Sequence, residues 1–172
     1  MKLSTRTRYA FHCMLAVSRL EKEGTPATAD KIAKACEKPK RYLEQIIHLL
    51  KKDALLQSTA GRRGGYRLSR PADKIMLSEI VAATVGPISV VECVLAPDTC
   101  DKAETCEFRL LYLLITHGVY QTLGKFSLAD MEDGELLASV CRELEQQIAA
   151  SARNGHQTPL SADHIPSRFR GA

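Results

Sequence analysis

The sequence predicts a mainly α-helical fold with a small β hairpin. Two observations carry this prediction: apolar residues recur at three- and four-residue spacing in several segments, and two short extended stretches flank a glycine-rich link. The chain has 172 residues, of which 45% are hydrophobic, so it can bury a core but is too short for two full-sized domains. A small domain with an appended helical part fits this length.

Charge divides the chain into two unlike halves. The net charge is +4, from 24 Lys+Arg and 20 Asp+Glu, yet residues 1–74 hold 17 basic and 7 acidic residues, a balance of +10. Residues 75–172 hold the remaining 7 basic and 13 acidic residues, a balance of −6. This asymmetry is typical of a protein whose N-terminal part binds a polyanion and whose C-terminal part has another role. The alternative is that the charge of the surface is unevenly distributed by chance.

Neither a membrane protein nor a disulfide-built protein is expected. The longest apolar run, residues 110–115, falls far short of the roughly 20 residues that a membrane span needs. The 6 cysteines are irregularly spaced and too sparse for a disulfide scaffold. The charged N-terminus does not resemble a signal peptide, so we expect a cytoplasmic protein with reduced thiols.

Three helices are expected in the basic half. Residues 4–20 carry an apolar helical stripe, and a break containing Gly and Pro follows. Thr28 is placed to cap a short helix through Cys36, and Pro39 suits the first turn of a third helix. This helix-turn-helix layout leaves a polar face on the third helix. The residues of that face are Lys40, Arg41, Glu44, Gln45, His48, Lys51 and Lys52.

A hairpin is expected directly after the third helix. Residues 55–58 and 66–69 read as two short strands, and the link 60–65 contains three glycines with Arg62 and Arg63. A hairpin with such a tip beside a helix-turn-helix is a wing. A nucleotide-binding loop is disfavoured because that loop follows a strand and opens a helix. An ordinary exposed hairpin is the stronger alternative, although it does not call for paired arginines.

The acidic half is expected to continue with a short helix over 78–85, an extended stretch over 88–95, and a loop holding cysteines. A long helix over 102–123 follows, with an apolar face so broad that we expect an intermolecular seam. A last helix over 135–152 and a disordered tail complete the chain. The predicted domains are a winged helix-turn-helix DNA-binding domain (1–74), the cysteine loop with the dimerisation helices (75–152), and the tail (153–172).

Three cysteines lie together before the long helix, in the pattern Cys93-x6-Cys100-x5-Cys106. Three thiolates this close in sequence can converge on one soft metal centre, and the lack of a Cys-x-x-Cys pair disfavours a zinc ribbon. Inert thiols in a helical dimer are the alternative that the spacing leaves open.

Several motifs resemble those of the Rrf2 family of bacterial winged-helix transcription regulators: residues 1–4, Arg8-Tyr9-Ala10, Tyr42-Leu43-Glu44-Gln45 and Gly61-x-x-Gly64-Gly65-Tyr66. The resemblance covers residues 1 to about 133. It implies a homodimeric transcriptional regulator, not an enzyme, with double-stranded DNA as its partner. The cysteine pattern resembles the cluster-binding branch of this family. That branch implies an iron–sulfur cluster, 2Fe-2S or 4Fe-4S, bound by Cys93, Cys100 and Cys106.

The sequence departs from the family pattern at the fourth ligand of the cluster, and the gap between the first two cysteines is one residue longer than usual. Some members use a histidine three residues after the last cysteine, where this chain has Arg109. Others use the first helix of the partner protomer, at the position of Arg8 here. Arginine cannot ligate iron, and His12, one helical turn beyond Arg8, is the candidate that replaces it. The alternative is that His12 is an ordinary residue of the dimer interface. Glu104, Glu107, water or a small molecule would then supply the fourth ligand of the cluster.

The resemblance and the layout together assign roles at the DNA. The third helix is expected to enter the major groove, with Arg62 and Arg63 along the adjacent minor groove. Glu44 and Gln45 are placed to discriminate bases. A two-fold dimer predicts a palindromic operator with half-sites about one helical turn apart. The residues expected to neutralise phosphates are Lys40, Arg41, Lys51 and Lys52.

The expected function is therefore transcription regulation in which an iron–sulfur cluster controls operator binding and responds to redox conditions, nitric oxide or iron status. The alternative is a cluster-free regulator of the same family that senses through cysteine oxidation, a metabolite or a partner protein. Catalysis has little support, since the sequence holds no His/Glu zinc motif and no Ser/His/Asp order typical of a hydrolase.

Overall fold

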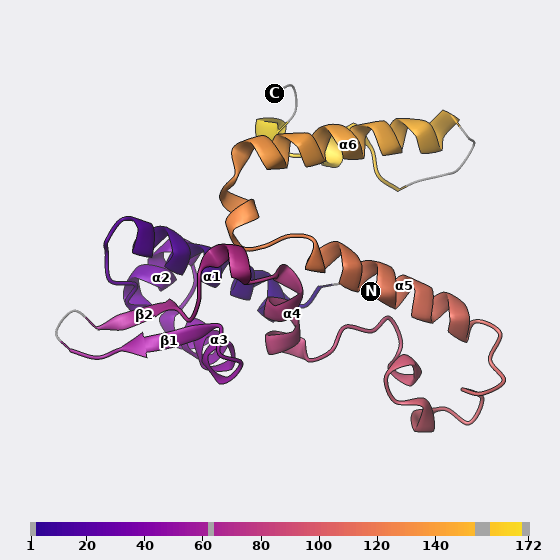
Figure 1. Ribbon diagram of the computed structural model, residues 1–172, viewed down its shortest axis with the longest axis horizontal. Helices are drawn as coiled ribbons and strands as arrows, with labels where there is room; N and C mark the ends of the chain where they lie inside the picture. Colours follow the sequence, from indigo (N-terminus) through magenta and orange to yellow (C-terminus); the bar gives the residue numbers. More distant parts are fainter. Residues whose placement is uncertain (1–2, 62–63, 154–158, 170–172) are drawn as a thin grey trace. The chain divides into compact units, whose positions relative to one another are not determined.

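The computed structural model describes residues 3–61, 64–153 and 159–169. The chain forms two compact units, Met1–Leu128 and Ala129–Ala172. The fold is mainly helical with one two-stranded antiparallel sheet, as the sequence predicts (Figure 1). Among the described residues, none of the helices has the length and apolar character needed to cross a membrane.

The three predicted helices of the basic half are confirmed as α1 (Thr5–Lys22), α2 (Ala29–Cys36) and α3 (Lys40–Lys52). Ser4 and Thr28 cap α1 and α2, because the hydroxyl oxygen of each accepts a hydrogen bond from a backbone N–H of the first turn. Pro39 precedes the first residue of α3 instead of lying within its first turn. The local signals of the sequence therefore locate these helices to within two residues.

The core of the first unit lies where α1, α2 and α3 meet α4 (Leu77–Val85). These helices bury one side each, and complete burial of an aliphatic side chain contributes roughly 1.5–3 kcal/mol. The largest fully buried side chains include Met14, Ile32, Leu43, Ile46, Ile47, Leu50, Leu55, Ile75 and Ile80. Because α3 contributes four of its thirteen residues to this core, its orientation in the unit is fixed.

The hairpin is confirmed as β1 (Leu56–Thr59) and β2 (Gly65–Leu68), each one residue away from its predicted bounds. The strands pair antiparallel with Leu56 opposite Leu68, and β2 also bridges to Ala27. Gly65 is required at this bridge, because a Cβ there would lie 2.9 Å from the carbonyl oxygen of Ala27. The wing is therefore attached to the chain that enters α2.

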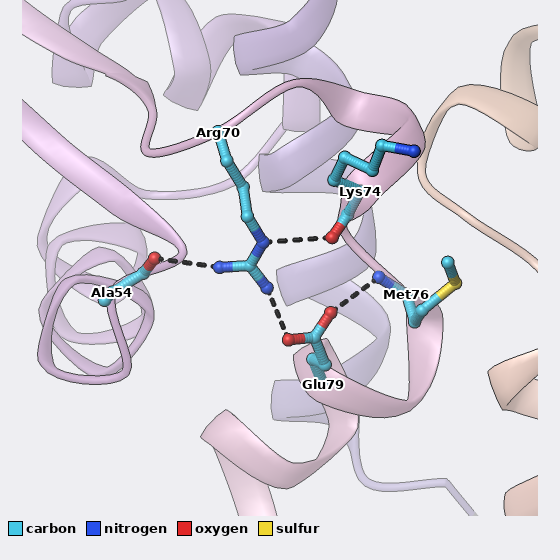
Figure 2. Close-up of polar contacts among 5 residues, drawn as sticks. All are labelled: Ala54, Arg70, Lys74, Met76 and Glu79. Carbon is cyan, nitrogen blue, oxygen red and sulfur yellow. Dashed lines mark hydrogen bonds and ion pairs between the residues drawn. The ribbon is translucent and has the colours of Figure 1, made fainter.

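Arg70 connects the base of the wing to α3 and α4, as Figure 2 shows. Its Nε donates to the carbonyl oxygen of Lys74 at 2.9 Å, and a second nitrogen donates to the carbonyl oxygen of Ala54 at 3.3 Å. The third nitrogen pairs with the carboxylate of Glu79, whose other oxygen accepts from the backbone N–H of Met76 at 2.8 Å. One side chain thus connects the turn after α3 to the start of α4.

Two buried hydroxyls connect α1 to α4. The Oγ1 atoms of Thr7 and Thr84 lie 2.9 Å apart, and both residues are buried. Thr7 also bonds the hydroxyl of Ser4 at 2.9 Å, and Thr84 donates to the carbonyl oxygen of Val81 at 2.9 Å. Each hydroxyl therefore keeps at least one further hydrogen bond besides the one that joins the helices.

The segment between α4 and the long helix differs from the prediction. Residues 88–95 were expected to be extended, but they contain the 3-10 helix η2 (Glu92–Val94), and η3 (Pro97–Thr99) follows. The long helix α5 spans Arg109–Gly124, so its start lies seven residues beyond the predicted residue 102.

Tight turns replace the predicted first helical turns of α5. The backbone N–H of Ala103 donates to the carbonyl oxygen of Cys100 at 2.9 Å, and that of Thr105 donates to Lys102 at 3.1 Å. Ala103 is also buried, at 5% exposure. These turn contacts satisfy the backbone without a helix, and the apolar periodicity begins only after them.

The chain that leaves α5 returns to α4. The backbone N–H of Leu77 donates to the carbonyl oxygen of Phe126 at 2.9 Å, and that of Leu128 donates to Ile75 at 2.8 Å. These two hydrogen bonds attach both ends of the segment 77–126 to each other, so α4 and α5 belong to the same unit.

The second unit contains η4 (Ala129–Glu132) and α6 (Gly134–Arg153), which agrees with the last predicted helix. Two short 3-10 helices, η5 (Ala162–His164) and η6 (Ser167–Phe169), lie in the tail that was expected to be disordered. Ile165 between them is buried, at 6% exposure.

Candidate nucleic-acid interface and cysteine segment

The polar face of α3 is exposed to solvent. Leu43, Ile46, Ile47 and Leu50 point into the core, and their spacing turns the opposite side of the helix outward. The structure confirms the predicted amphipathic pattern, although it does not test contact with DNA. The exposed residues are Lys40, Arg41, Glu44, Gln45, His48, Lys51 and Lys52.

Two of the basic side chains on this face already have partners within the chain. Lys40 Nζ lies 3.0 Å from a carboxylate oxygen of Asp30 on α2. The pKa of Lys40 is raised, first by this hydrogen bond and then by the charge of Asp30. Lys51 Nζ lies 6.0 Å from the centre of the Tyr66 ring in the wing. Asp30 therefore competes with a DNA phosphate for Lys40.

A groove of about 540 Å³ runs between the start of α1 and the exposed face of α3. Arg6 lines it from α1, and Arg41, Glu44, Gln45, His48 and Leu49 line it from α3. Arg6 was not among the predicted site residues, and no sequence signal indicates it, because its position depends on how α1 packs on α3. His48 was predicted on the polar face but was given no role.

A second groove, of about 500 Å³, lies where α1 meets the turn between α2 and α3. Tyr9 packs edge-on against Tyr42, with ring centroids 5.8 Å apart, and Lys38 Nζ lies 4.9 Å from the centre of the Tyr9 ring. A hydrogen bond with Lys38 is the main cause that lowers the pKa of Tyr9. His12 is exposed and lines this groove beside Cys36.

The tip of the wing can be described only in part. Arg62 and Arg63, predicted for the minor groove, lie outside the described residues. Gly61 has a φ of 104°, a conformation that favours glycine, and a Cβ on Gly64 would lie 2.7 Å from the carbonyl oxygen of Thr59. Both glycines are therefore required by the turn itself, without any bound nucleotide.

The three cysteines of the predicted cluster site lie on the irregular segment before α5. Cys93 is in η2, Cys100 directly follows η3, and Cys106 precedes α5. All three are half-buried free thiols. Among the described residues, no three His, Cys, Asp or Glu side chains lie close enough to hold a metal ion. The structure therefore does not gather these thiols into a preformed site, and it does not place His12 in one.

The chemistry around the thiols nevertheless suits an anionic sulfur centre. Three free thiols supply the ligands that iron–sulfur clusters use. The backbone N–H of Arg109 donates to the carbonyl oxygen of Cys106 at 3.1 Å. The side-chain Nε of Arg109 is buried and has no hydrogen-bond partner in the described part of the chain. A buried N–H donor without an acceptor is costly, so an anionic group that accepted this hydrogen bond would stabilise the segment.

The other cysteines have different surroundings. Cys13 is fully buried on α1, and Cys141 is buried on α6. Burial is the main cause that raises the pKa of Cys13 well above its ordinary range, and burial also raises that of the half-buried Cys36. These thiols pack in or beside the cores of their units, as expected for cysteines that contribute to packing.

Helix α5 leaves its apolar side chains in water. None of its residues is buried, and Leu110 and Leu114 are 77% and 68% exposed. Large contiguous apolar surfaces on a single chain mark interaction sites. The exposed apolar residues on or next to this helix are Phe108, Leu110, Leu111, Leu113, Leu114, Ile115 and Tyr120.

Comparison with known proteins gives a consistent result. Residues 3–134 match the family model of Rrf2, described as an iron-dependent transcriptional regulator. The chain is 32% identical over 137 residues to Protein rrf2 of Nitratidesulfovibrio vulgaris, covering 79% of this chain and 91% of that protein. It is 30% identical over 131 residues to the HTH-type transcriptional regulator IscR of Xenorhabdus nematophila, covering 76% and 79%.

A solved structure agrees with the sequence relatives. The structure of CymR, the global cysteine regulator of B. subtilis, superposes with a TM-score of 0.62 and 30% identity, covering 76% of this chain and 95% of that one. The match supports the winged-helix architecture. The relatives thus include one regulator associated with cysteine.

Proposed function

The chain belongs to the Rrf2 family of transcriptional regulators, and from this premise we propose a homodimer that binds a palindromic operator under the control of an iron–sulfur cluster. As a member of this family it is a regulator and not an enzyme. The observation that carries the proposed contact with DNA is the exposed basic face of α3, in a half-chain with 17 basic and 7 acidic residues.

The α3 face has the composition that major-groove recognition needs. Glu44 and Gln45 are exposed near the middle of the helix, where a carboxylate can accept from cytosine N4 and an amide can pair with adenine. The flanking cations fix the position of the helix through phosphates. The residues in that second role are Lys40, Arg41, Lys51 and Lys52, and we assign Arg62 and Arg63 to the minor groove.

A second copy of the chain is the proposed occupant of the apolar face of α5. Side chains as exposed as Leu110 and Leu114 favour burial against a similar surface, and a two-fold dimer is the commonest way to supply one. A dimer of winged helices binds two half-sites about one helical turn apart, roughly 34–36 Å. The operator is then palindromic because the dimer is symmetric.

The proposed cluster ligands are Cys93, Cys100 and Cys106, with His12 of the partner protomer as the candidate fourth. The free thiols and the description of the family model as iron-dependent support this assignment. A bound cluster supplies a centre that oxidants, nitric oxide and iron shortage can disassemble. Because the thiols are not gathered in the single chain, residues 93–106 must rearrange to bind it.

Anaerobic reconstitution tests the cluster. We expect visible absorption and stoichiometric iron and sulfide in the wild type, and loss of both in Cys100→Ser. Cys36→Ser is the matched control, because Cys36 is also half-buried but lies in the DNA-binding head. His12→Ala is expected to change the spectrum or lifetime of the cluster. Colourless protein without iron and sulfide would reject the cluster and favour the cluster-free regulator.

DNA binding is tested with a duplex selected from a random pool. Fluorescence anisotropy over about 50–200 mM salt gives the affinity and the salt slope. Arg41→Gln is expected to weaken binding and lower the slope by about one unit per lost phosphate contact. Arg153→Gln removes an exposed arginine from α6 and serves as the control. Absence of binding at low salt, with and without iron, would overturn the proposed function.

A further inference from the structure

We propose that Arg6 and His48 form a proton-linked binding site for a DNA phosphate beside α3, so that operator binding weakens as the pH rises. The proposal rests on the proposed DNA-binding function and extends it to two residues to which the sequence assigned no role. It concerns the groove between the first turn of α1 and the exposed face of α3.

The groove has the geometry of a contact site that follows one face of α3. Arg41, Glu44 and His48 are spaced by three and four residues, so their side chains lie in one row along the helix. Arg6, exposed in the first turn of α1, lines the same groove from the other side. This row includes Glu44, which we assign to reading the DNA bases. A group bound in the groove therefore lies beside the duplex that α3 recognises.

The charges in the groove favour an anion. Arg6 and Arg41 each present a planar guanidinium that can donate two hydrogen bonds to a phosphate. Glu44 is the single acidic residue among those lining the groove. A DNA phosphate is the anion available at this position, because the recognition face of α3 lies along a duplex whose backbone flanks the major groove.

His48 makes this contact depend on pH, because histidine is the side chain that changes charge between about pH 5 and 8. The charged groups around it are Arg6 from α1 and Arg41, Glu44, Lys51 and Lys52 from α3. A phosphate in the groove favours the charged imidazolium over the neutral ring, so binding takes up a proton on His48.

The sign of the effect follows from proton uptake. The affinity gained by protonation is fully present at low pH and is lost as the pH rises through the range in which the bound histidine titrates. One proton taken up per protomer corresponds to a loss of up to about tenfold in affinity per pH unit for that protomer. The dimer doubles this dependence when both heads are bound.

Anisotropy between about pH 6 and 8 at constant ionic strength tests the proposal. The wild type is expected to lose affinity as the pH rises, His48→Gln to show a flatter profile, and His164→Gln, an exposed histidine of the second unit, to behave as the wild type. Equal pH profiles for the wild type and His48→Gln would overturn the proposal. A wild type that binds DNA with no pH dependence would overturn it and leave the proposed function standing.

Two further variants distinguish a phosphate contact from a side-chain pair within α3. Arg6→Gln is expected to lower the salt slope by about one unit per protomer, and an unchanged slope would remove Arg6 from the site. Glu44→Gln is expected to keep the pH dependence. If Glu44→Gln abolishes the pH dependence of DNA binding, protonated His48 pairs with Glu44 within the helix, and the phosphate site is rejected. Failure of the wild type to bind any duplex at low salt would overturn the proposed function as well.

Discussion

Replacing Arg70 by glutamine is expected to lower the free energy of unfolding by about 1–3 kcal/mol. The guanidinium donates to the carbonyl oxygens of Lys74 and Ala54, at 2.9 and 3.3 Å, and pairs with the carboxylate of Glu79. At about 1.5 kcal/mol each, three contacts would contribute about 4.5 kcal/mol. The side chains of Arg70 and Glu79 remain 33% and 43% exposed, so water replaces part of this loss and the lower range is expected.

Urea unfolding of Arg70→Gln and Arg67→Gln measures this loss against a matched control. Arg67 is an exposed arginine of β2, so its replacement removes the same charge and is expected to change the stability by no more than about 0.5 kcal/mol. Glu79→Gln keeps an acceptor for the backbone N–H of Met76 and is expected to cost less than Arg70→Gln. If Arg70→Gln is no less stable than Arg67→Gln, the network in Figure 2 does not stabilise the fold.

Three further results are expected. Leu50→Ala is expected to lower the free energy of unfolding by about 2–5 kcal/mol in urea titrations, because Leu50 is fully buried; a loss below about 1 kcal/mol would contradict its place in the core. Asp30→Asn is expected to tighten DNA binding at low salt, since it frees Lys40 and removes a negative charge beside the duplex; weaker binding in anisotropy would contradict this. Iodoacetamide at neutral pH is expected to modify the cysteines of residues 93–106 and to spare Cys13, because the raised pKa and the burial of Cys13 leave little accessible thiolate. Peptide mass spectrometry distinguishes the sites, and rapid labelling of Cys13 would refute this expectation.

The helix-turn-helix could be predicted from the sequence because its signals are local. Ser4 and Thr28 cap helices through their own hydroxyls, and the apolar spacing of α3 alone determines which side is buried. The wing could be predicted for the same reason, since the link between its strands contains glycine where the backbone requires it, as at Gly61. In each case the residues that determine the structure lie within a few positions of each other.

The segment 88–108 was predicted poorly because local signals are weak there. Short 3-10 helices need no apolar stripe, so the pattern around Cys93 does not distinguish them from an extended chain. The late start of α5 depends on the burial of Ala103 and on turn hydrogen bonds, and neither has a signature in composition. The helical period that begins near Phe108 was therefore extended too far toward the N-terminus.

In the candidate site, too, features set by one helix could be predicted from the sequence, and contacts between elements could not. The outward residues of α3 could be predicted, because they follow from the period of one helix. Contacts between elements could not be predicted: the ion pair of Lys40 with Asp30 joins α3 to α2, and the groove partner Arg6 comes from α1. Such contacts depend on how the helices pack. Whether the three cysteines come together also depends on packing, and among the described residues no such group is present.

Helix α4 is the element through which the cysteine segment and the DNA-binding face can influence each other. Thr84 bonds α1 through Thr7, and Glu79 reaches the end of α3 through Arg70. The backbone of Leu77 pairs with the chain that leaves α5. A rearrangement of residues 93–106 that shifts α4 must therefore either break these discrete contacts or carry α1 and α3 with it. The pair of Thr7 and Thr84 is buried, and a buried hydrogen bond is costly to leave unmade, so a shift of α4 is expected to carry α1 with it. Under the proposed function, this is the route by which a change at the thiols would reach the DNA-binding face.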